Sequence, residues 1–223
     1  MAKQAESAGG YPILLHLQDK QVAVIGGGPV GTRKVRHLLR TGARVLLISP
    51  DASAELESLA DNGEIEWIAA RYQRDMLNDY MPILVIAATD DPNVNQTVAQ
   101  DAHRIRALCN VANGSSDHSD FSNMALIERA PLTIALGSNG KSPALLRMLK
   151  EQLESEFGDE YALLADWLGE LRASQRGQPA SQAERQMLYE NIVTSDVPTL
   201  LRVGDRKKAR QLFEAILRED IAK

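Results

Sequence analysis

Short apolar runs, rich in Val and Ile, recur between Gly, Pro and Asp residues along the first part of the chain. They do not alternate with polar residues, a pattern typical of strands that are buried on both faces. Amphipathic stretches of helix length lie between several of them, which predicts βαβ units around a parallel sheet. The predicted strands are Gln21–Ile25, Arg44–Ile48, Glu64–Ala69, Ile83–Ala88, Ala107–Val111 and Leu132–Leu136, and the predicted helices are Val30–Thr41, Ser53–Asn62 and Asn93–His103.

The strand pattern ends near residue 143. Beyond it, apolar residues recur at spacings of three and four, which is typical of amphipathic helices. Breaks separate these stretches at Gly158, Ser174–Ser181 and Asp196–Gly204. The sequence therefore predicts an α/β part followed by a helical part. The predicted helices of the second part are Ala144–Phe157, Asp159–Arg172, Gln182–Thr194 and Arg206–Arg218.

Composition excludes several classes of protein. The 223 residues carry a formal net charge of −5 and only 4% aromatic residues, which argues against a nucleic-acid partner. The single cysteine, Cys109, excludes an intramolecular disulfide framework, and His16, His37 and His103 show no metal-ligand spacing, so we expect no metal site. No run approaches the roughly 18 consecutive apolar residues that cross a bilayer. Without a secretory signal at residues 1–10, the cytoplasm is the expected compartment.

A glycine-rich loop carries the most information about function. Gly26, Gly28 and Gly31 form a G-x-G-x-x-G motif directly after a predicted strand and directly before a predicted helix. The first glycine permits a tight turn, the second lets a pyrophosphate approach the backbone, and the third allows close helix–strand packing. Pro29 suits the first helical turn, and Val30 follows it. The motif predicts a dinucleotide-binding site in a Rossmann-like sheet.

An acidic residue stands at the expected distance from this loop. Asp51 follows the second predicted strand and Pro50, and lies 20 residues beyond Gly31. A carboxylate at that place typically binds the adenosine ribose hydroxyls. The alternative is that Asp51 only caps the helix that begins near Ala52. With no arginine beside it, Asp51 favours NAD over NADP.

Further polar residues follow the next two predicted strands. Thr89 and Asp90 close the strand Ile83–Ala88, so they are expected to flank the nicotinamide or the substrate at the carboxyl ends of the strands. Asp91 precedes Pro92 and is more simply explained as a helix start. The same geometry places Asn110 at the rim after the following strand.

Several ordered motifs in the chain resemble those of the precorrin-2 dehydrogenase / sirohydrochlorin ferrochelatase family, the NAD-dependent module of siroheme synthesis. The resemblance extends from about Tyr11 to Glu154, and more weakly through the helical tail. Its most specific stretch is Ser138–Pro143, with the sequence Ser-Asn-Gly-Lys-Ser-Pro, which opens a helix. The other motifs are Tyr11–Ile13, Gly26–Val30, Arg33–Lys34, Ala87–Asp91, Asn95, Cys109–Val111 and Arg129–Leu132.

The resemblance implies three parts: an NAD-binding Rossmann domain at 1–113, a small α+β dimerisation section at 114–150, and a helical domain at 151–223. It implies a homodimer that oxidises precorrin-2, a tetrapyrrole, to sirohydrochlorin with NAD as acceptor. Pro29, Val30, Pro50 and Asp51 would contact NAD, and Ser138 would face the substrate.

A substrate with eight carboxylates requires local positive charge in an acidic protein. Lys141 and Arg129 are the first candidates for binding these carboxylates. Arg33, Lys34 and Arg36 on the first helix are further candidates, although cations on a helix often form only a solvated face.

The chain departs from the family at one important position. Many members that also insert iron carry an aspartate where this chain has Asn113, and an amide does not titrate. Dehydrogenation is therefore expected without strong chelatase activity. Asp117, His118 and Asp120 are the other candidates for proton transfer, unless their loop is only a polar surface loop. A bifunctional dehydrogenase and chelatase, and a non-catalytic NAD-sensing regulator, are the alternatives.

Overall fold

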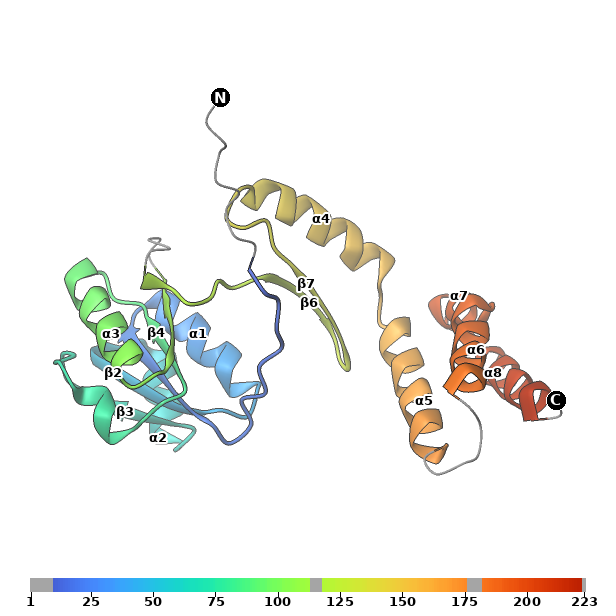
Figure 1. The fold of residues 1–223 in the computed structure, drawn as a ribbon, viewed down its shortest axis with the longest axis horizontal. Helices are drawn as coiled ribbons and strands as arrows, with labels where there is room; N and C mark the ends of the chain where they lie inside the picture. Colours follow the sequence, from blue (N-terminus) through green and yellow to red (C-terminus); the bar gives the residue numbers. More distant parts are fainter. Residues whose placement is uncertain (1–9, 113–117, 176–181, 222–223) are drawn as a thin grey trace. The chain divides into compact units, whose positions relative to one another are not determined.

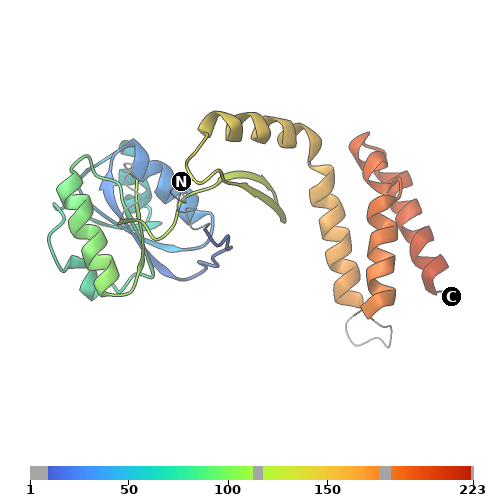
Figure 2. The ribbon, with the colours of Figure 1, turned by 45° about the horizontal axis from the view of Figure 1, so that its top comes forward.

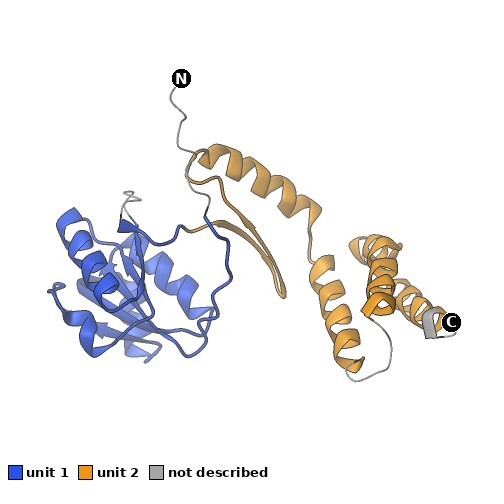
Figure 3. Cartoon of the chain, viewed as in Figure 1, with its two compact units in different colours: residues 1–122 blue, residues 123–223 orange. Residues whose placement is uncertain are grey.

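The computed structural model describes residues 10–112, 118–175 and 182–221 (Figure 1). The chain divides into two compact units, Met1–Ser122 and Asn123–Lys223 (Figure 3). The three-part division at residues 113 and 150 stays a prediction.

A five-stranded parallel sheet forms the centre of the first unit. The strand order β3-β2-β1-β4-β5 places β1 in the middle. Such an arrangement is Rossmann-like, so the predicted α/β fold is confirmed. Side chains on the inner strands are almost wholly buried, as the unbroken apolar runs predict. The strands are β1 Gln21–Gly27, β2 Arg44–Ala52, β3 Ile65–Ile68, β4 Leu84–Ala87 and β5 Leu108–Val111.

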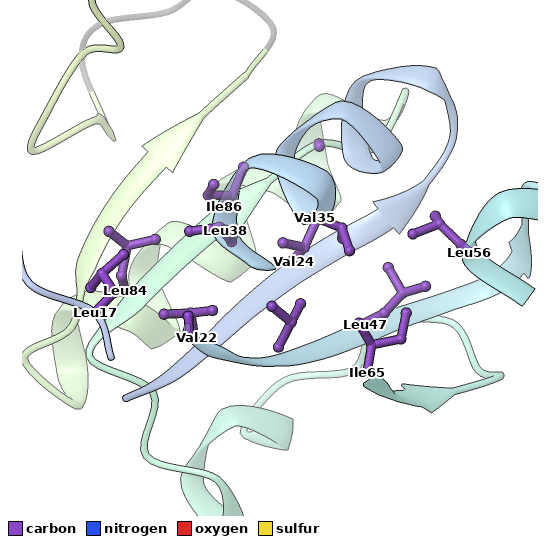
Figure 4. Packing of buried hydrophobic residues seen from close by; sticks show 13 residues of the cluster. Leu17, Val22, Val24, Val35, Leu38, Leu47, Leu56, Ile65, Leu84 and Ile86 are labelled. Atoms are coloured by element: carbon purple, nitrogen blue, oxygen red, sulfur yellow. The ribbon is translucent and has the colours of Figure 1, made fainter. Parts of the chain in front are cut away.

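Helices cover both faces of this sheet (Figures 1 and 2). Helices α1 (Pro29–Leu39) and α2 (Ala54–Asp61) pack on one face, and α3 (Pro92–Arg104) packs on the other. Figure 4 shows the first of these cores, in which Val35 and Leu38 of α1 point at the strands beneath. The apolar faces of three helices thus close the two sides of the sheet.

A short 3-10 helix, η1 (Met76–Asp79), lies in the connection between β3 and β4. Asp101 of α3 fixes this connection, because its buried carboxylate accepts hydrogen bonds from the Tyr72 hydroxyl at 2.8 Å and the Asp75 N–H at 2.9 Å. Arg104 pairs with the carboxylates of both Asp101 and Asp75. These residues have a structural role on the α3 side of the sheet.

The second unit begins with a hairpin. Strands β6 (Ala125–Arg129) and β7 (Leu132–Leu136) pair antiparallel, with a cis bond between Ala130 and Pro131. The predicted strand Leu132–Leu136 is therefore confirmed. The prediction that it is buried on both faces is wrong, since every second residue of β7 is exposed. A five-residue apolar run does not by itself reveal how many faces are covered.

Helices make up the rest of the second unit. Ser142 is the N-cap of helix α4 (Pro143–Glu156), and its hydroxyl accepts the Leu145 N–H, as the Ser-Pro pair predicts. Helices α5 (Glu160–Ser174), α6 (Gln182–Thr194), α7 (Val197–Arg202) and α8 (Arg206–Ile221) share one apolar core. Figure 2 shows α6 beside α8.

The prediction of a continuous break at Asp196–Gly204 is wrong, because α7 occupies most of it. Pro198 stands in the first turn of α7, where a missing N–H costs no hydrogen bond. Buried Val197 and Leu201 attach this short helix to the core.

Two negative findings apply to the described ranges. None of their helices has the length and apolar character required to cross a bilayer. Within the same ranges, no group of three or more His, Cys, Asp or Glu side chains is placed to hold a metal ion.

Candidate functional site

The carboxyl ends of four strands bring the predicted cofactor residues together. The register joins Gly27 of β1 to Ala52 of β2, and Ile25 of β1 to Ala87 of β4. Ala87 in turn pairs with Val111 of β5. The glycine loop therefore lies between the segment that follows β2 and the segment that follows β4, the place where ligands bind in such sheets.

Two glycines of the motif are required by close backbone packing. Gly26 adopts a φ of 114°, and a Cβ there would overlap the carbonyl of Ala88 at the end of β4. A Cβ at Gly31 would overlap the carbonyl oxygen of Gly26. These contacts hold the first turn of α1 directly above the end of β1.

Gly28 differs from these two glycines, since a Cβ at this position would meet no atom of the described chain within 4 Å. Its backbone adopts φ −75° and ψ −173°, which any residue tolerates. Packing therefore does not require a glycine here. The space above Gly28 is what the close approach of a pyrophosphate needs.

The start of α1 has the electrostatic character of an anion site. Gly28 is the N-cap and supplies no capping side chain, and the first turn contains no acidic residue. The first N–H groups of a helix have no partner within the helix, and the helix dipole places positive charge at this end. The glycine loop thus fits the pyrophosphate of a dinucleotide.

Side chains from neighbouring segments fix the loop. The buried hydroxyl of Ser49 accepts the N–H of Gly27 at 2.8 Å, and the N–H of Ser53 donates to the Gly27 carbonyl at 3.1 Å. The Thr32 hydroxyl lies 2.9 Å from the Ser53 hydroxyl and 3.0 Å from the Gly28 carbonyl. Ser49, Thr32 and Ser53 were not predicted, because a hydroxyl residue near a strand end gives no sign of its partner.

Asp51 is available to a ligand. It lies in β2 beside the loop with an exposed side chain, as does Pro50. The N-cap of α2 is Ser53, whose hydroxyl accepts the Leu56 N–H. The alternative that Asp51 only caps this helix is therefore wrong. Within the described part of the chain, the Asp51 carboxylate has no ion pair or hydrogen bond.

Asn95 holds Thr89 at the end of β4. The Asn95 Oδ1 accepts both the Thr89 hydroxyl at 2.7 Å and the Thr89 N–H at 3.1 Å, and Asn95 Nδ2 donates to the Thr89 carbonyl at 2.9 Å. Asn95 is only 2% exposed. Asp90 is exposed at the same rim, and Asp91 caps α3, as its place before Pro92 predicts.

Asn110 and Asp120 hold the segment after β5 against that strand. Asn110 is buried, and its Nδ2 donates to the Phe121 carbonyl at 2.8 Å. The Asp120 carboxylate accepts the Cys109 N–H at 2.8 Å and lies 3.1 Å from His103 Nε2. Burial, with a contribution from the Asp120 charge, raises the pKa of Cys109 to about 12, so its thiol stays protonated. These contacts give Asp120 a structural role.

The remaining candidates for proton transfer are only partly described. Asn113 and Asp117 lie outside the described residues. His118 is described, and its side chain is partly buried.

The predicted substrate residues lie in the second unit. Ser138 opens a tight turn, since its carbonyl accepts the Lys141 N–H and its hydroxyl accepts the Ser142 N–H at 3.1 Å. The Lys141 side chain is exposed. Arg129 Nε lies 3.2 Å from an Asp159 carboxylate oxygen, as an ion pair without a hydrogen bond. The positive charge of Arg129 is therefore already partly neutralised by Asp159.

Known families match both units. Residues 13–124, half of the chain, match the family described as “Putative NAD(P)-binding”. Residues 160–217 match the “Sirohaem synthase dimerisation region”, which lies after the section 114–150 that the resemblance assigned to dimerisation. The chain thus carries a nicotinamide-cofactor domain followed by a dimerisation region.

Curated relatives match nearly the whole chain. Siroheme synthase 1 of Aeromonas salmonicida is 37% identical over 210 residues, covering 94% of this chain and 44% of the relative. Siroheme synthase of Xylella fastidiosa is 34% identical over 212 residues, with 94% and 44% covered. The chain therefore spans less than half the length of these relatives.

A solved structure described as “SirC, precorrin-2 dehydrogenase” matches with a TM-score of 0.75 and 26% sequence identity. The match covers 92% of this chain and 100% of that one. The chain therefore belongs to the NAD(P)-binding family that matches its first half, and its resemblance to the precorrin-2 dehydrogenase / sirohydrochlorin ferrochelatase family is confirmed.

Proposed function

We propose that the chain is an NAD-dependent precorrin-2 dehydrogenase, which oxidises precorrin-2 to sirohydrochlorin. The observation that carries this proposal is the likeness to a precorrin-2 dehydrogenase over all of that protein's length. The fit of the glycine loop to a pyrophosphate supports it independently. The reaction removes one hydride and one proton from the macrocycle, giving NADH and sirohydrochlorin.

The first unit binds and orients the cofactor. The N–H groups at the start of α1 bind the pyrophosphate above Gly28, beside Pro29 and Val30. The Asp51 carboxylate accepts hydrogen bonds from the adenosine ribose hydroxyls and repels a 2′-phosphate, so the chain prefers NAD to NADP. When bound, the nicotinamide supplies the hydride acceptor.

The rim after β4 and β5 orients the substrate. Asn95 holds Thr89 and the backbone beside it in one arrangement. Asp120 binds the Cys109 N–H and His103 through its Oδ2 and stays a candidate for the proton acceptor. His118 is a described candidate whose imidazole nitrogen can accept a proton.

Metal insertion places a different demand on the chain. Inserting ferrous iron into sirohydrochlorin requires acceptors for two pyrrole protons. Asn113 stands where many bifunctional members have an aspartate, and an amide cannot accept a proton. Dehydrogenation is the main activity for this reason, and chelatase activity is weak.

The active form is a homodimer. The match of residues 160–217 to a dimerisation region supports this. In addition, α4 has no buried residue, and its Leu145 and Met148 side chains are each 46% exposed. A second copy of the chain would cover such apolar side chains.

Incubation of the purified chain with precorrin-2 and NAD should produce equal amounts of NADH and sirohydrochlorin, because one hydride leaves each substrate molecule. Both products are followed by absorbance. A chain that binds NADH tightly but neither binds precorrin-2 nor reduces NAD in its presence would instead be a non-catalytic NAD-sensing regulator.

The two kinds of glycine in the motif should respond differently to alanine. Gly28→Ala should fold with an unchanged Tm, since its Cβ meets open space, and should lose NADH affinity by about ten-fold or more as the methyl group obstructs the pyrophosphate. Gly31→Ala should also destabilise the fold by about 1–3 kcal/mol, because its Cβ overlaps the Gly26 carbonyl. Thermal unfolding and NADH fluorescence titration separate the two effects. Unchanged NADH affinity in Gly28→Ala contradicts the placement of the pyrophosphate.

Replacing Asp51 should change cofactor choice. Asp51→Ala removes the acceptor for the ribose hydroxyls and the repulsion of a 2′-phosphate, so the ratio of kcat/KM for NAD to that for NADP should fall about ten-fold or more. Asp61→Ala, at an exposed position at the end of α2, is the matched control and should leave the ratio unchanged. An unchanged ratio in Asp51→Ala would assign cofactor choice to another residue.

Chelatase activity should depend on residue 113. The natural chain should insert ferrous iron into sirohydrochlorin only slightly faster than the uncatalysed reaction, and Asn113→Asp should increase that rate by supplying a carboxylate. The rate is measured from the siroheme absorbance. Rapid insertion by the natural chain would favour the bifunctional alternative.

A further inference from the structure

Three cations on α1 have different surroundings. The guanidinium of Arg36 forms a two-point ion pair with Glu55 of α2, with distances of 2.9 and 2.6 Å. Arg33 is exposed to solvent. Lys34 is only partly exposed, and in the part of the chain that the structure describes it has no carboxylate partner. Among the described residues, Lys34 is therefore a partly buried cation without a counter-charge.

The helix period places Lys34 on one particular side of α1. Leu38 of α1 and Ile86 of β4 belong to the same hydrophobic core, which Figure 4 shows. Lys34 precedes Leu38 by four residues, so it lies on the same side of the helix, one turn nearer the glycine loop. Val30 precedes Lys34 by four more residues. Lys34 thus lies toward β4, whereas Arg36 reaches in the other direction, toward α2.

These two sides of α1 correspond to the two ends of a bound dinucleotide. Asp51, at the end of β2, is on the adenosine side, and the segments after β4 and β5 are on the nicotinamide side. The substrate must approach the nicotinamide. Lys34 is therefore on the substrate side of the glycine loop, and Arg36 on the adenosine side.

We propose that the Lys34 ammonium group binds a carboxylate of the tetrapyrrole substrate. The inference rests on the proposed function, because a substrate that carries several carboxylates is what an uncompensated cation at this place would recognise.

The charges around Lys34 favour this role. Burial, together with the charge of the neighbouring Arg33, lowers the pKa of Lys34 from its ordinary value. The charged form of Lys34 is therefore destabilised in the chain without substrate. The Asp120 carboxylate, described after β5, is already engaged with His103 and the Cys109 N–H. A substrate carboxylate would supply the missing counter-charge.

A lysine stem can also serve only to cover apolar surface while its ammonium reaches water. Substitutions separate the two roles. Lys34→Met keeps a long apolar stem and loses the charge, whereas Lys34→Arg keeps the charge. If the stem alone matters, Lys34→Met will behave like the natural chain.

Uroporphyrin, a stable porphyrin with eight carboxylates, is a probe that requires no turnover. Lys34→Met should weaken uroporphyrin binding by about ten-fold or more, and Lys34→Arg should restore most of it. In Lys34→Met, Tm should stay unchanged and NADH affinity should stay within about two-fold of the natural chain's value. The same is expected of the control Arg44→Gln, which removes a charge at the opposite end of β2. Unchanged uroporphyrin affinity in Lys34→Met overturns the proposal. An equal loss of NADH affinity also overturns it, because Lys34 would then bind the cofactor.

Kinetics give a second readout that separates this inference from the proposed function. With precorrin-2, Lys34→Met should raise KM about ten-fold or more while kcat changes less, since the substrate is held less tightly but reacts in the same way. Absence of NAD reduction by the natural chain would refute the proposed function. A natural chain that reduces NAD, with a Lys34→Met variant of unchanged KM, would refute only the role of Lys34.

Discussion

The contact between two backbones at the start of α1 is the constraint on which the candidate site depends. Gly31 lies so close to the Gly26 carbonyl that no side chain fits between them, and a Cβ at Gly26 would overlap the Ala88 carbonyl after β4. The contacts of Gly31 with Gly26, and of Gly26 with Ala88, together fix the start of α1 above the centre of the sheet. The uncapped N–H groups of the helix are thereby directed to the space above Gly28, where a pyrophosphate fits.

The order of the strands then gives the two sides of this loop different chemistry. β2 lies on one side and supplies Asp51, while the Arg36–Glu55 ion pair lies toward the same side. β4 lies on the other side and supplies Thr89, which Asn95 holds. A dinucleotide bound across the loop would have its adenosine over the first side and its nicotinamide over the second. The partly buried Lys34 belongs to the second side, which is why its charge bears on the substrate.

Local pattern was sufficient to predict the sheet and the glycine loop, since unbroken apolar runs and closely spaced glycines each have one dominant physical explanation. It was insufficient where the outcome depended on distant partners. Strand β6 (Ala125–Arg129) was missed because it is paired with β7. Helix α7 was missed because its short sequence is held in place by the packing of Val197 and Leu201 in the core. The serine that fixes Gly27 stands 22 residues away, at Ser49. The contact between Asp120 and the Cys109 N–H likewise joins residues 11 apart, so no local pattern reveals it.

The central claim is that one glycine loop places the dinucleotide across the sheet with its reactive end toward β4 and β5. A crystal structure of the chain with NAD and uroporphyrin bound tests this claim most directly. The account predicts the pyrophosphate above Gly28, the adenosine ribose at Asp51, and the nicotinamide between Thr89 and the porphyrin. A dinucleotide bound in the opposite direction, or away from the start of α1, would contradict it.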